Sequence, residues 1–211
     1  MKFESITMEN FMRYKGRNHI EFSCDDVKNV TVVLGDNTVG KTTIAQAFRW
    51  GLYGALMANG TKSAGDFQLL NTDILEMMDA NSRAKVKVEI TAVDEEKRYI
   101  ITRETTYTRA FPKLESREFQ KKCAMRITEL EDMESYVEVD SNEIETLINE
   151  LFPKNLSHYF LFDGERWNDV SVGGVRENIK ESVHILTGLS AYREAKNHLK
   201  DMGSNSVIKK F

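Results

Sequence analysis

The spacing of apolar residues predicts antiparallel strands at the start of the chain. Residues 2–11 show the pattern of a half-buried strand with an irregularity, and residues 18–23 place Ile20 and Phe22 on one face of a second strand. We expect the two strands to pair through a connection at residues 15–17.

A second antiparallel region is predicted near the middle of the chain. Residues 84–90 alternate strictly between polar and apolar side chains, residues 94–97 form a turn sequence, and residues 98–107 return as a second strand. A third strand over residues 124–128 would extend this hairpin.

Residues 29–35, NVTVVLG, carry a different pattern, because Val30, Val32, Val33 and Leu34 form a nearly continuous apolar run. Such a run is typical of a strand that is buried on both faces, as in the parallel part of a sheet. The run ends at Gly35, and residues 41–53 follow with helical spacing. We therefore expect a central strand, a glycine-bearing loop and a helix in succession.

Two further segments have helical periodicity. Residues 141–152 form an amphipathic pattern that Ser141 or Asn142 is suited to cap, with Pro153 just beyond its end. Residues 175–200 are also helical in pattern, with a possible break at Gly188. Between these two helices, residues 158–163 read as another buried strand.

The segment GDNTVGKT, residues 35–42, matches the phosphate-binding pattern G-x-x-x-x-G-K-[ST]. Glycines at Gly35 and Gly40 allow a close backbone approach, so that successive N–H groups surround phosphate oxygens. In this pattern Lys41 reaches the β- and γ-phosphates and Thr42 offers its hydroxyl to Mg²⁺. The sequence predicts binding of ATP with Mg²⁺, and the candidate contacts are Gly35, Asp36, Asn37, Thr38, Val39, Gly40, Lys41, Thr42 and Thr43.

A second candidate is Asp163 in FLFDGE, which follows the predicted strand over residues 158–163. One interpretation makes Asp163 a Walker-B-like aspartate that holds Mg²⁺ through water, so that the chain is a complete small NTPase with Lys41 and Asp163 as its candidate catalytic residues. Another makes this strand and loop a γ-phosphate sensor beside the metal. A buried strand that ends in a capped turn is the structural alternative.

Composition excludes several classes of protein. The net charge is −4, so any contact with DNA must come from a local patch rather than from an overall basic surface. No apolar run approaches the roughly 18 residues that span a membrane. The two cysteines, Cys24 and Cys123, match no metal-binding spacing. These features favour a cytoplasmic protein with reduced thiols.

Taken together, NFMRYKG, GDNTVGKTTIAQAFRWGLYG, ITRETTY and NLSHYFLFDGE resemble SMC-like ATPases of the Rad/SbcC type. Their order is similar to the N-terminal half of such an ATPase head, and most similar to the DndD-like ATPases of DNA phosphorothioation and phage defence. The resemblance implies an α/β fold: a P-loop NTPase of the ABC/SMC head type, with a mixed sheet, an antiparallel hairpin and helices in its N-terminal lobe.

The resemblance also assigns three residues outside the phosphate loop. It places Asp163 where the repair ATPases carry their Q-loop glutamine, near Mg²⁺ and the attacking water. It brings Arg13 and Lys62 toward the nucleotide, although the repair ATPases carry an arginine directly after Asn-Phe, where Met12 stands here. For Arg13 and Lys62 the alternative is a solvated loop.

The family's LSGG-type signature, second Asp-Glu strand and switch histidine are not found in these 211 residues. We therefore expect residues 1–174 to form the N-terminal lobe of the head and residues 175–211 a helix at the root of a coiled coil. The implied partners are the C-terminal half of the same head, a second head across ATP, the DNA backbone, and a nuclease or modification enzyme.

Two other classes of function stay open. A self-contained P-loop NTPase or kinase would use Asp163 as its Walker-B aspartate, and would need a basic lid, for which Arg166 and Arg176 are available. A nucleotide-gated interaction module would bind ATP without hydrolysing it. Phosphate release by the chain, alone and with a candidate C-terminal half, separates the three classes.

Overall fold

The structure is a computed structural model that describes residues 1–36, 39–56, 68–94, 96–110, 115–130, 135–154, 157 and 161, without the side chains of residues 110 and 115–120. The chain divides into two compact units, Met1–Leu161 and Phe162–Phe211. All the described residues belong to the first unit. The predicted helix over residues 175–200 lies outside them.

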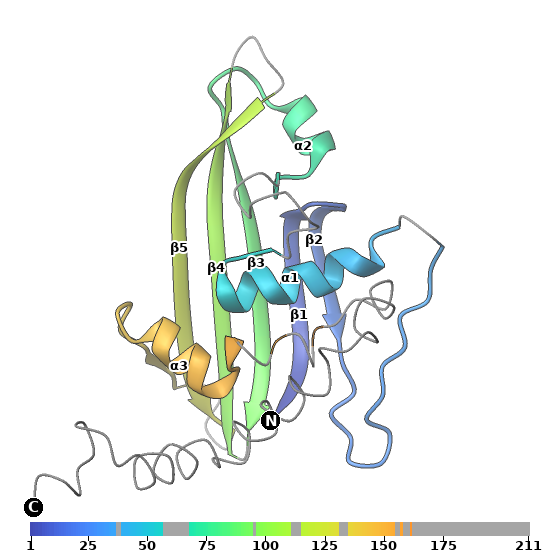
Figure 1. The fold of residues 1–211 in the computed structure, drawn as a ribbon, viewed down its shortest axis with the longest axis vertical. Coiled ribbons are helices and arrows are strands. Elements are labelled where there is room, and N and C mark those ends of the chain that lie inside the picture. Colours follow the sequence, from blue (N-terminus) through green and yellow to red (C-terminus); the bar gives the residue numbers. More distant parts are fainter. Residues whose placement is uncertain are drawn as a thin grey trace, which may run out of the picture. The chain divides into compact units, whose positions relative to one another are not determined.

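A six-stranded antiparallel sheet forms the frame of the first unit, in the order β2-β1-β3-β4-β5-β6 (Figure 1). Its strands are β1 (Lys2–Phe11), β2 (Tyr14–Glu21), β3 (Arg83–Asp94), β4 (Lys97–Ala110), β5 (Glu115–Glu129) and β6 (Val137–Glu138). The predicted strand pair and central hairpin are confirmed. The third strand of the hairpin region is also confirmed, and is longer than predicted.

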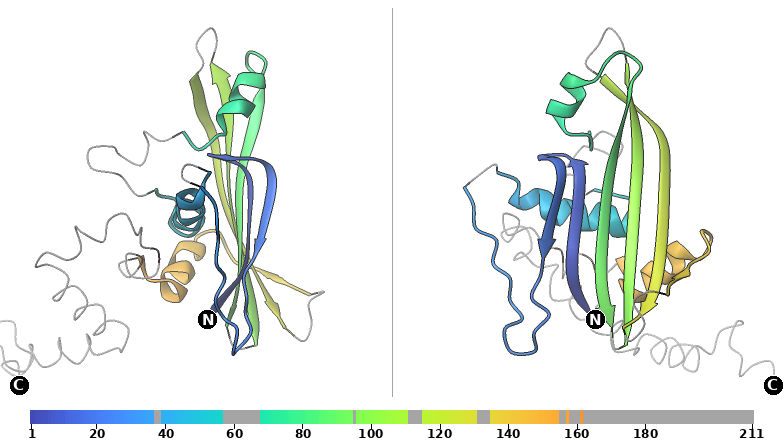
Figure 2. Two further views of the ribbon diagram at one scale, coloured as in Figure 1. Left: turned by 90° about the vertical axis from the view of Figure 1, so that its right-hand side faces the viewer. Right: turned by 180° about the vertical axis from the view of Figure 1, so that it is seen from behind.

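One face of the sheet is apolar because the strands alternate. In β3, Val86, Val88 and Ile90 are fully buried, and the intervening residues are more exposed. The helices α1 (Lys41–Tyr53), α2 (Thr72–Met77) and α3 (Ile144–Leu151) lie on the same side of the sheet (Figure 2). The expected α/β lobe with an antiparallel hairpin and helices is therefore present.

Helix α1 packs on the sheet through an aromatic cluster and a close backbone contact. Phe48 packs against Phe3 and Phe22, with ring centroids 4.8 and 5.7 Å apart. At Gly51 the helix comes so close to β3 that an added Cβ would lie 2.6 Å from Ile90 Cδ1. The predicted helix over residues 41–53 is thus confirmed, and its packing fixes the start of the helix relative to the sheet.

The turn between β1 and β2 differs from the prediction. Residues 15–17 belong to β2, and the chain reverses at Met12 and Arg13, between the paired residues Phe11 and Tyr14. Met12 has a φ of 49°, a left-handed conformation that its unbranched side chain tolerates better than a β-branched residue would. The sequence pattern misplaced the turn because Gly16 suggests a loop, whereas it lies within the strand.

The predicted central strand over residues 29–35 is wrong for this structure. No strand is assigned to these residues, and Val30, Val32 and Leu34 are 76%, 71% and 89% exposed. A strand buried on both faces needs a neighbour on each edge and cover on each side. None of the described strands pairs with this segment, so its apolar side chains stay in solvent.

One smaller expectation needs correction, and another falls almost entirely outside the described residues. Helix α3 begins after Glu143, which makes no side-chain capping bond, so neither Ser141 nor Asn142 is the N-cap. In the region of the predicted strand over residues 158–163, only Leu161 is described. Its N–H donates to Ser157 O at 2.8 Å, and the rest of this predicted strand lies outside the described residues.

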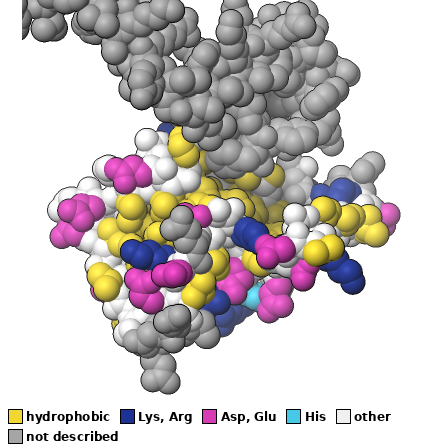
Figure 3. Space-filling view, turned by 90° about the horizontal axis from the view of Figure 1, so that it is seen from below, with side chains coloured by type: hydrophobic (Ala, Val, Ile, Leu, Met, Phe, Trp, Pro, Cys, Tyr) yellow, Lys and Arg dark blue, Asp and Glu magenta, His cyan; other side chains and the backbone are white. Residues whose placement is uncertain are grey.

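The described surface combines apolar and charged side chains. Seen from below, hydrophobic side chains gather on this face with Lys, Arg, Asp and Glu side chains around them (Figure 3). None of the helices among the described residues is long and apolar enough to cross a membrane. Both cysteines, Cys24 and Cys123, are free thiols and partly buried.

Candidate functional site: the phosphate loop and its supports

The loop at residues 35–40 depends on two glycines. A Cβ at Gly35 would lie 2.8 Å from Val39 Cγ2, so only glycine lets the two ends of the loop approach this closely. Gly40 is buried and has a φ of 113°, a conformation that residues with a Cβ rarely adopt. Both features fit a backbone cradle for phosphate, as the sequence predicts. The candidates Asn37 and Thr38 lie outside the described residues.

Helix α1 begins directly after this loop and is open at its first turn. Its N-cap is Gly40, which has no side chain to bond the first N–H groups, and no acidic residue lies in the first turn. The early N–H groups of a helix have no partner within the helix. Together with the positive end of the helix dipole, they make this terminus suited to an anion.

The three residues at the start of α1 differ in exposure. Lys41 and Thr42 are exposed, whereas the Thr43 side chain is 7% exposed and packs into the protein. Lys41 Nζ donates to Gly35 O and Asp36 O, both at 2.6 Å, so the ammonium lies over the loop. The arrangement places one cation and one free hydroxyl beside the open helix terminus, and leaves Thr43 only its backbone N–H for a ligand.

The β1–β2 turn reaches the same loop from the sheet. If Gly40 carried a Cβ, that atom would lie 3.5 Å from Arg13 Cβ and 3.4 Å from Tyr14 Cε2. The Tyr14 hydroxyl donates to Gly40 O at 3.3 Å. Burial raises the pKa of this hydroxyl, so it remains a donor at neutral pH. Arg13 is thus beside the loop, as the family resemblance implies, with its side chain exposed.

Sequence reasoning did not single out Tyr14. Tyr14 and Gly40 are 26 residues apart, and no local pattern relates a strand residue to a loop so far along the chain. The motif NFMRYKG contains Tyr14 and was the available signal. Only the folded arrangement shows that this motif touches the phosphate loop.

The other end of α1 is fixed by Arg103 on β4. Its guanidinium donates to Gly51 O and Leu52 O, each at 3.1 Å, and to Glu145 Oε1 on α3 at 2.8 Å. The Arg103 side chain is 13% exposed. The last carbonyls of a helix lack partners within it and carry partial negative charge, so a cation here is favourable. Arg103 therefore joins the end of α1 to the sheet and to α3.

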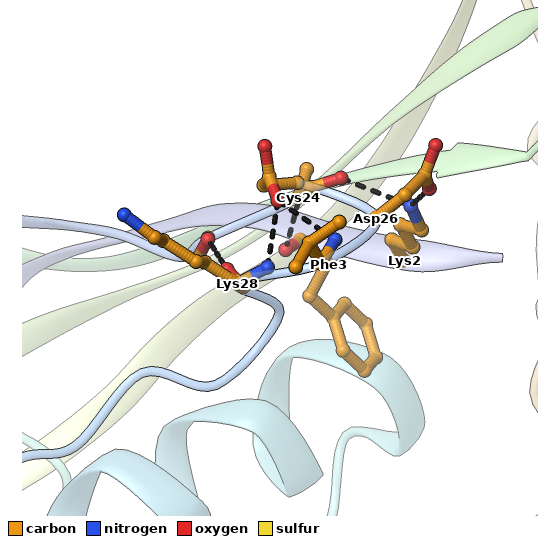
Figure 4. Close-up of polar contacts among 8 residues, drawn as sticks. Lys2, Phe3, Cys24, Asp26 and Lys28 are labelled. Carbon is orange, nitrogen blue, oxygen red and sulfur yellow. Dashed lines mark hydrogen bonds and ion pairs between the residues drawn. The ribbon is translucent and has the colours of Figure 1, made fainter.

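The segment that leads into the loop starts from a well-fixed turn (Figure 4). Lys2 Nζ donates to Cys24 O at 2.9 Å and to Asp26 Oδ1 at 2.5 Å. The Asp25 carboxylate accepts from the N–H groups of Val27 and Lys28, at 2.7 and 2.6 Å. These backbone hydrogen bonds lower the pKa of Asp25, and the Lys2 ammonium lowers that of Asp26. The turn is tied to β1, and the exposed apolar run begins beyond it.

The remaining predicted site residues lie outside the described part of the chain. Asp163 and Lys62 are among them, so the proposed metal contact of Asp163 stays a prediction. Within the described residues, no group of three or more His, Cys, Asp and Glu side chains lies close enough to hold a metal ion. Thr42 is the candidate metal contact that the structure places beside the phosphate loop.

Comparison with known proteins assigns a family. A family model described as AAA domain matches residues 5–206. No curated protein matches the chain. Among solved structures, a chain from a study of the ATP-driven dimerization and DNA stimulated activation of SMC ATPases is similar at 16% sequence identity. The similarity covers 85% of this chain and 99% of that chain, with a TM-score of 0.49.

Proposed function

Because the chain belongs to the AAA domain family, a family of P-loop ATPases, we propose that it binds ATP with Mg²⁺ as the N-terminal lobe of an SMC-like, DNA-associated ATPase head. The observation that carries the proposal is the open N-terminus of α1, with Lys41 and Thr42 exposed beside the glycine-built loop. A triphosphate is the ligand whose charge and length match such a site.

Each residue of the loop has a defined part in binding. In the proposed complex, backbone N–H groups of the loop and of the first turn of α1 would surround the phosphates. Lys41 Nζ would leave the carbonyls of Gly35 and Asp36 for the β- and γ-phosphate oxygens. A lysine ammonium has three donors, so it is able to bond oxygens of both phosphates. Thr42 Oγ1 would hold Mg²⁺, which neutralises charge on the phosphates when bound. Asp163 is proposed as the second metal contact, and Arg13 and Lys62 as residues near the nucleotide.

Titration with a fluorescent ATP analogue tests the site. Lys41→Ala should abolish binding at micromolar nucleotide, because the phosphates lose their main cation. Thr42→Ala should weaken mainly the part of the affinity that depends on Mg²⁺. Lys28→Ala is the matched control, since Lys28 is another exposed lysine outside the loop. Unchanged affinity in Lys41→Ala would reject the assignment of the loop.

The exposed apolar run over residues 30–34 supports the proposal that a segment of a partner covers it. Val32 is 71% exposed and Leu34 is 89% exposed, although the sequence is that of a strand buried on both faces. We infer that this segment becomes a strand when the C-terminal half of the same head adds parallel strands beside it. An extended peptide that completes a sheet gains backbone hydrogen bonds and buries its side chains.

Co-purification of the chain with a candidate C-terminal half tests this pairing. Val32→Asp should prevent assembly, because a charge cannot be buried between the strands and the cover of a sheet. Val137→Asp is the matched control, since Val137 on β6 is 69% exposed and outside the apolar run. Assembly that Val32→Asp leaves unchanged would contradict the proposed strand.

ATP hydrolysis is proposed to need the completed and dimerised head, in which ATP joins two heads and hydrolysis releases them. Phosphoryl transfer to water requires a positioned water and charge stabilisation around the γ-phosphate, and the described residues supply only the loop, Lys41 and Thr42. We expect phosphate release from the chain with its C-terminal half, and little from the chain alone. Turnover by the chain alone at about 1 s⁻¹ or more, lost in Asp163→Ala, would favour the self-contained P-loop enzyme.

A role on DNA, in modification, repair or phage defence beside a nuclease or modification enzyme, follows from the family resemblance. With a net charge of −4, the chain should contact DNA through backbone phosphates and only weakly. Binding should therefore fall steeply between low and physiological salt. Tight, sequence-selective binding by this chain in high salt would contradict the proposal.

A further inference from the structure

The peptide between Gly40 and Lys41 is held from outside the phosphate loop. Gly40 O accepts the Tyr14 hydroxyl at 3.3 Å and the N–H of Ile44, the first hydrogen bond of α1, at 3.3 Å. The Tyr14 ring also packs on Gly40, 3.4 Å from where a Cβ would lie. Since a peptide group is planar, fixing the direction of Gly40 O also fixes the direction of the Lys41 N–H on its other side.

Tyr14 is able to hold this peptide because the turn beneath it is locked to the sheet and to α2. Asn71, the N-cap of α2, donates from its side chain to Met12 O at 2.7 Å, and its backbone N–H donates to Asn10 O at 2.9 Å. Met12 N–H donates to Leu69 O at 2.6 Å. The Asn10 side chain in turn bonds Lys85 O and the Gly16 N–H, at 3.1 and 3.0 Å.

We propose that Tyr14 is a positioning residue for the phosphate loop, which presents the Lys41 N–H to the phosphates of the nucleotide. This inference rests on the proposed binding of ATP at residues 35–42. The hydroxyl acts through Gly40 O, and the ring acts by filling the side of the loop that faces the β1–β2 turn. In this role Tyr14 affects only the binding of the phosphates, so its effect on affinity should not depend on the nucleotide base.

The expected effects follow from removing the hydroxyl and the ring separately. A hydrogen bond contributes about 0.5–1.5 kcal/mol net, which corresponds to about two- to twelvefold in affinity. Tyr14→Phe should therefore weaken binding of the ATP analogue about two- to twelvefold. Tyr14→Ala also removes the ring against Gly40 and should weaken binding further, by at least about tenfold. Tyr136→Phe, at a tyrosine that is 54% exposed, should have no effect.

The experiment measures displacement of a fluorescent ATP analogue by ATP and by inorganic tripolyphosphate, with Mg²⁺, in the full chain and each variant. Both competitors should weaken by the same factor in Tyr14→Phe, with the thermal midpoint recorded beside each affinity. A loss for ATP with none for tripolyphosphate would overturn the inference and place Tyr14 against the base. A lowered midpoint with unchanged affinities would overturn it in favour of a purely structural role.

Lys41→Ala separates a failure of this inference from a failure of the proposed function. If Lys41→Ala binds both competitors as the parent does, the loop is not the phosphate site and both proposals fail. If Lys41→Ala loses binding while Tyr14→Phe and Tyr14→Ala keep parent affinities, the phosphate site stands and the role of Tyr14 is rejected. Should Tyr14→Ala not fold, Tyr14→Phe alone decides, because it keeps the ring.

Discussion

Replacing Gly51 with alanine tests how closely α1 must approach the sheet. The new Cβ would lie 2.6 Å from Ile90 Cδ1 and 3.1 Å from Val88 Cγ1, whereas carbon atoms pack at about 3.5–4.0 Å. Ile90 and Val88 are both 0% exposed, so neither side chain is able to turn out into solvent. The helix would have to withdraw from β3 by about 1 Å to restore an ordinary contact.

Two effects oppose each other in this variant. Alanine is favoured over glycine in a helix by about 1 kcal/mol, and overpacking a buried contact costs about 1–3 kcal/mol. We expect the contact to dominate, with a net loss of up to about 2 kcal/mol in the free energy of unfolding. Since α1 also begins at Lys41, the ATP analogue should bind more weakly to the variant.

Urea denaturation of Gly51→Ala, Ile90→Val and the double variant measures the contact. Ile90→Val alone should cost about 0.5–1.5 kcal/mol, but in the Gly51→Ala background it removes the clashing Cδ1 and should restore stability. Gly16→Ala is the control, because a Cβ at Gly16 would have no atom within 4 Å. The only cost there is the φ of +67°, which is unfavourable for alanine. If Gly51→Ala is more stable than the parent by the full difference of about 1 kcal/mol by which a helix favours alanine over glycine, the packing argument is wrong.

Three further predictions concern the supports of the site. Arg103→Met should lower the free energy of unfolding by about 2–3 kcal/mol, and Arg103→Lys should not restore it in urea titrations, because an ammonium lacks the forked donors. Tyr53 has its pKa raised to about 12 by burial, and its hydroxyl has no partner in the described part of the chain. Its contribution is therefore full below pH 10 and declines toward pH 12; Tyr53→Phe should flatten this decline between pH 10 and 12, and an unchanged slope would reject it. Asn71→Ala should cost about 1–2 kcal/mol through the lost cap, and Asn71→Asp, which keeps the capping oxygen but turns a buried carboxylate oxygen toward Met12 O, should cost at least as much in the same titrations.

The antiparallel part of the fold was predictable because its pairing is local. In β3, the alternation of Val86, Val88 and Ile90 predicts which side chains face the core, and the next strand follows after a short turn. The β1–β2 turn was placed wrongly because Gly16 resembles a loop residue, and its role depends on a bond to Asn10 that no pattern reveals. Periodicity identifies a buried face, but the position of a turn depends on contacts that form only in the folded chain.

The candidate site divides in the same way. The sequence from Gly35 to Thr42 predicts the loop. The structure places Gly40 and Lys41 at the start of a helix, where the motif requires them. The supports were not predictable from these residues. The loop and the helix are held by Tyr14, Arg103 and Asn71, which belong to other elements. The local sequence around each of these residues gives no sign of this role. Their roles come from the sheet order, which brings distant segments beside α1.

The apolar run over residues 30–34 predicts that the segment is buried, but it does not predict which strands bury it. A run that is apolar on both faces states that the segment needs cover on both sides. It does not state which strands provide this cover. In the described part of the chain, β2 and β6 are the edge strands of the sheet, and residues 30–34 pair with neither of them. The exposed valines and leucine directly before the phosphate loop are the reason for our proposal that strands from a partner segment cover them. Completing the sheet would also fix the segment that leads directly into the loop, so that assembly of the head and binding of ATP should reinforce each other.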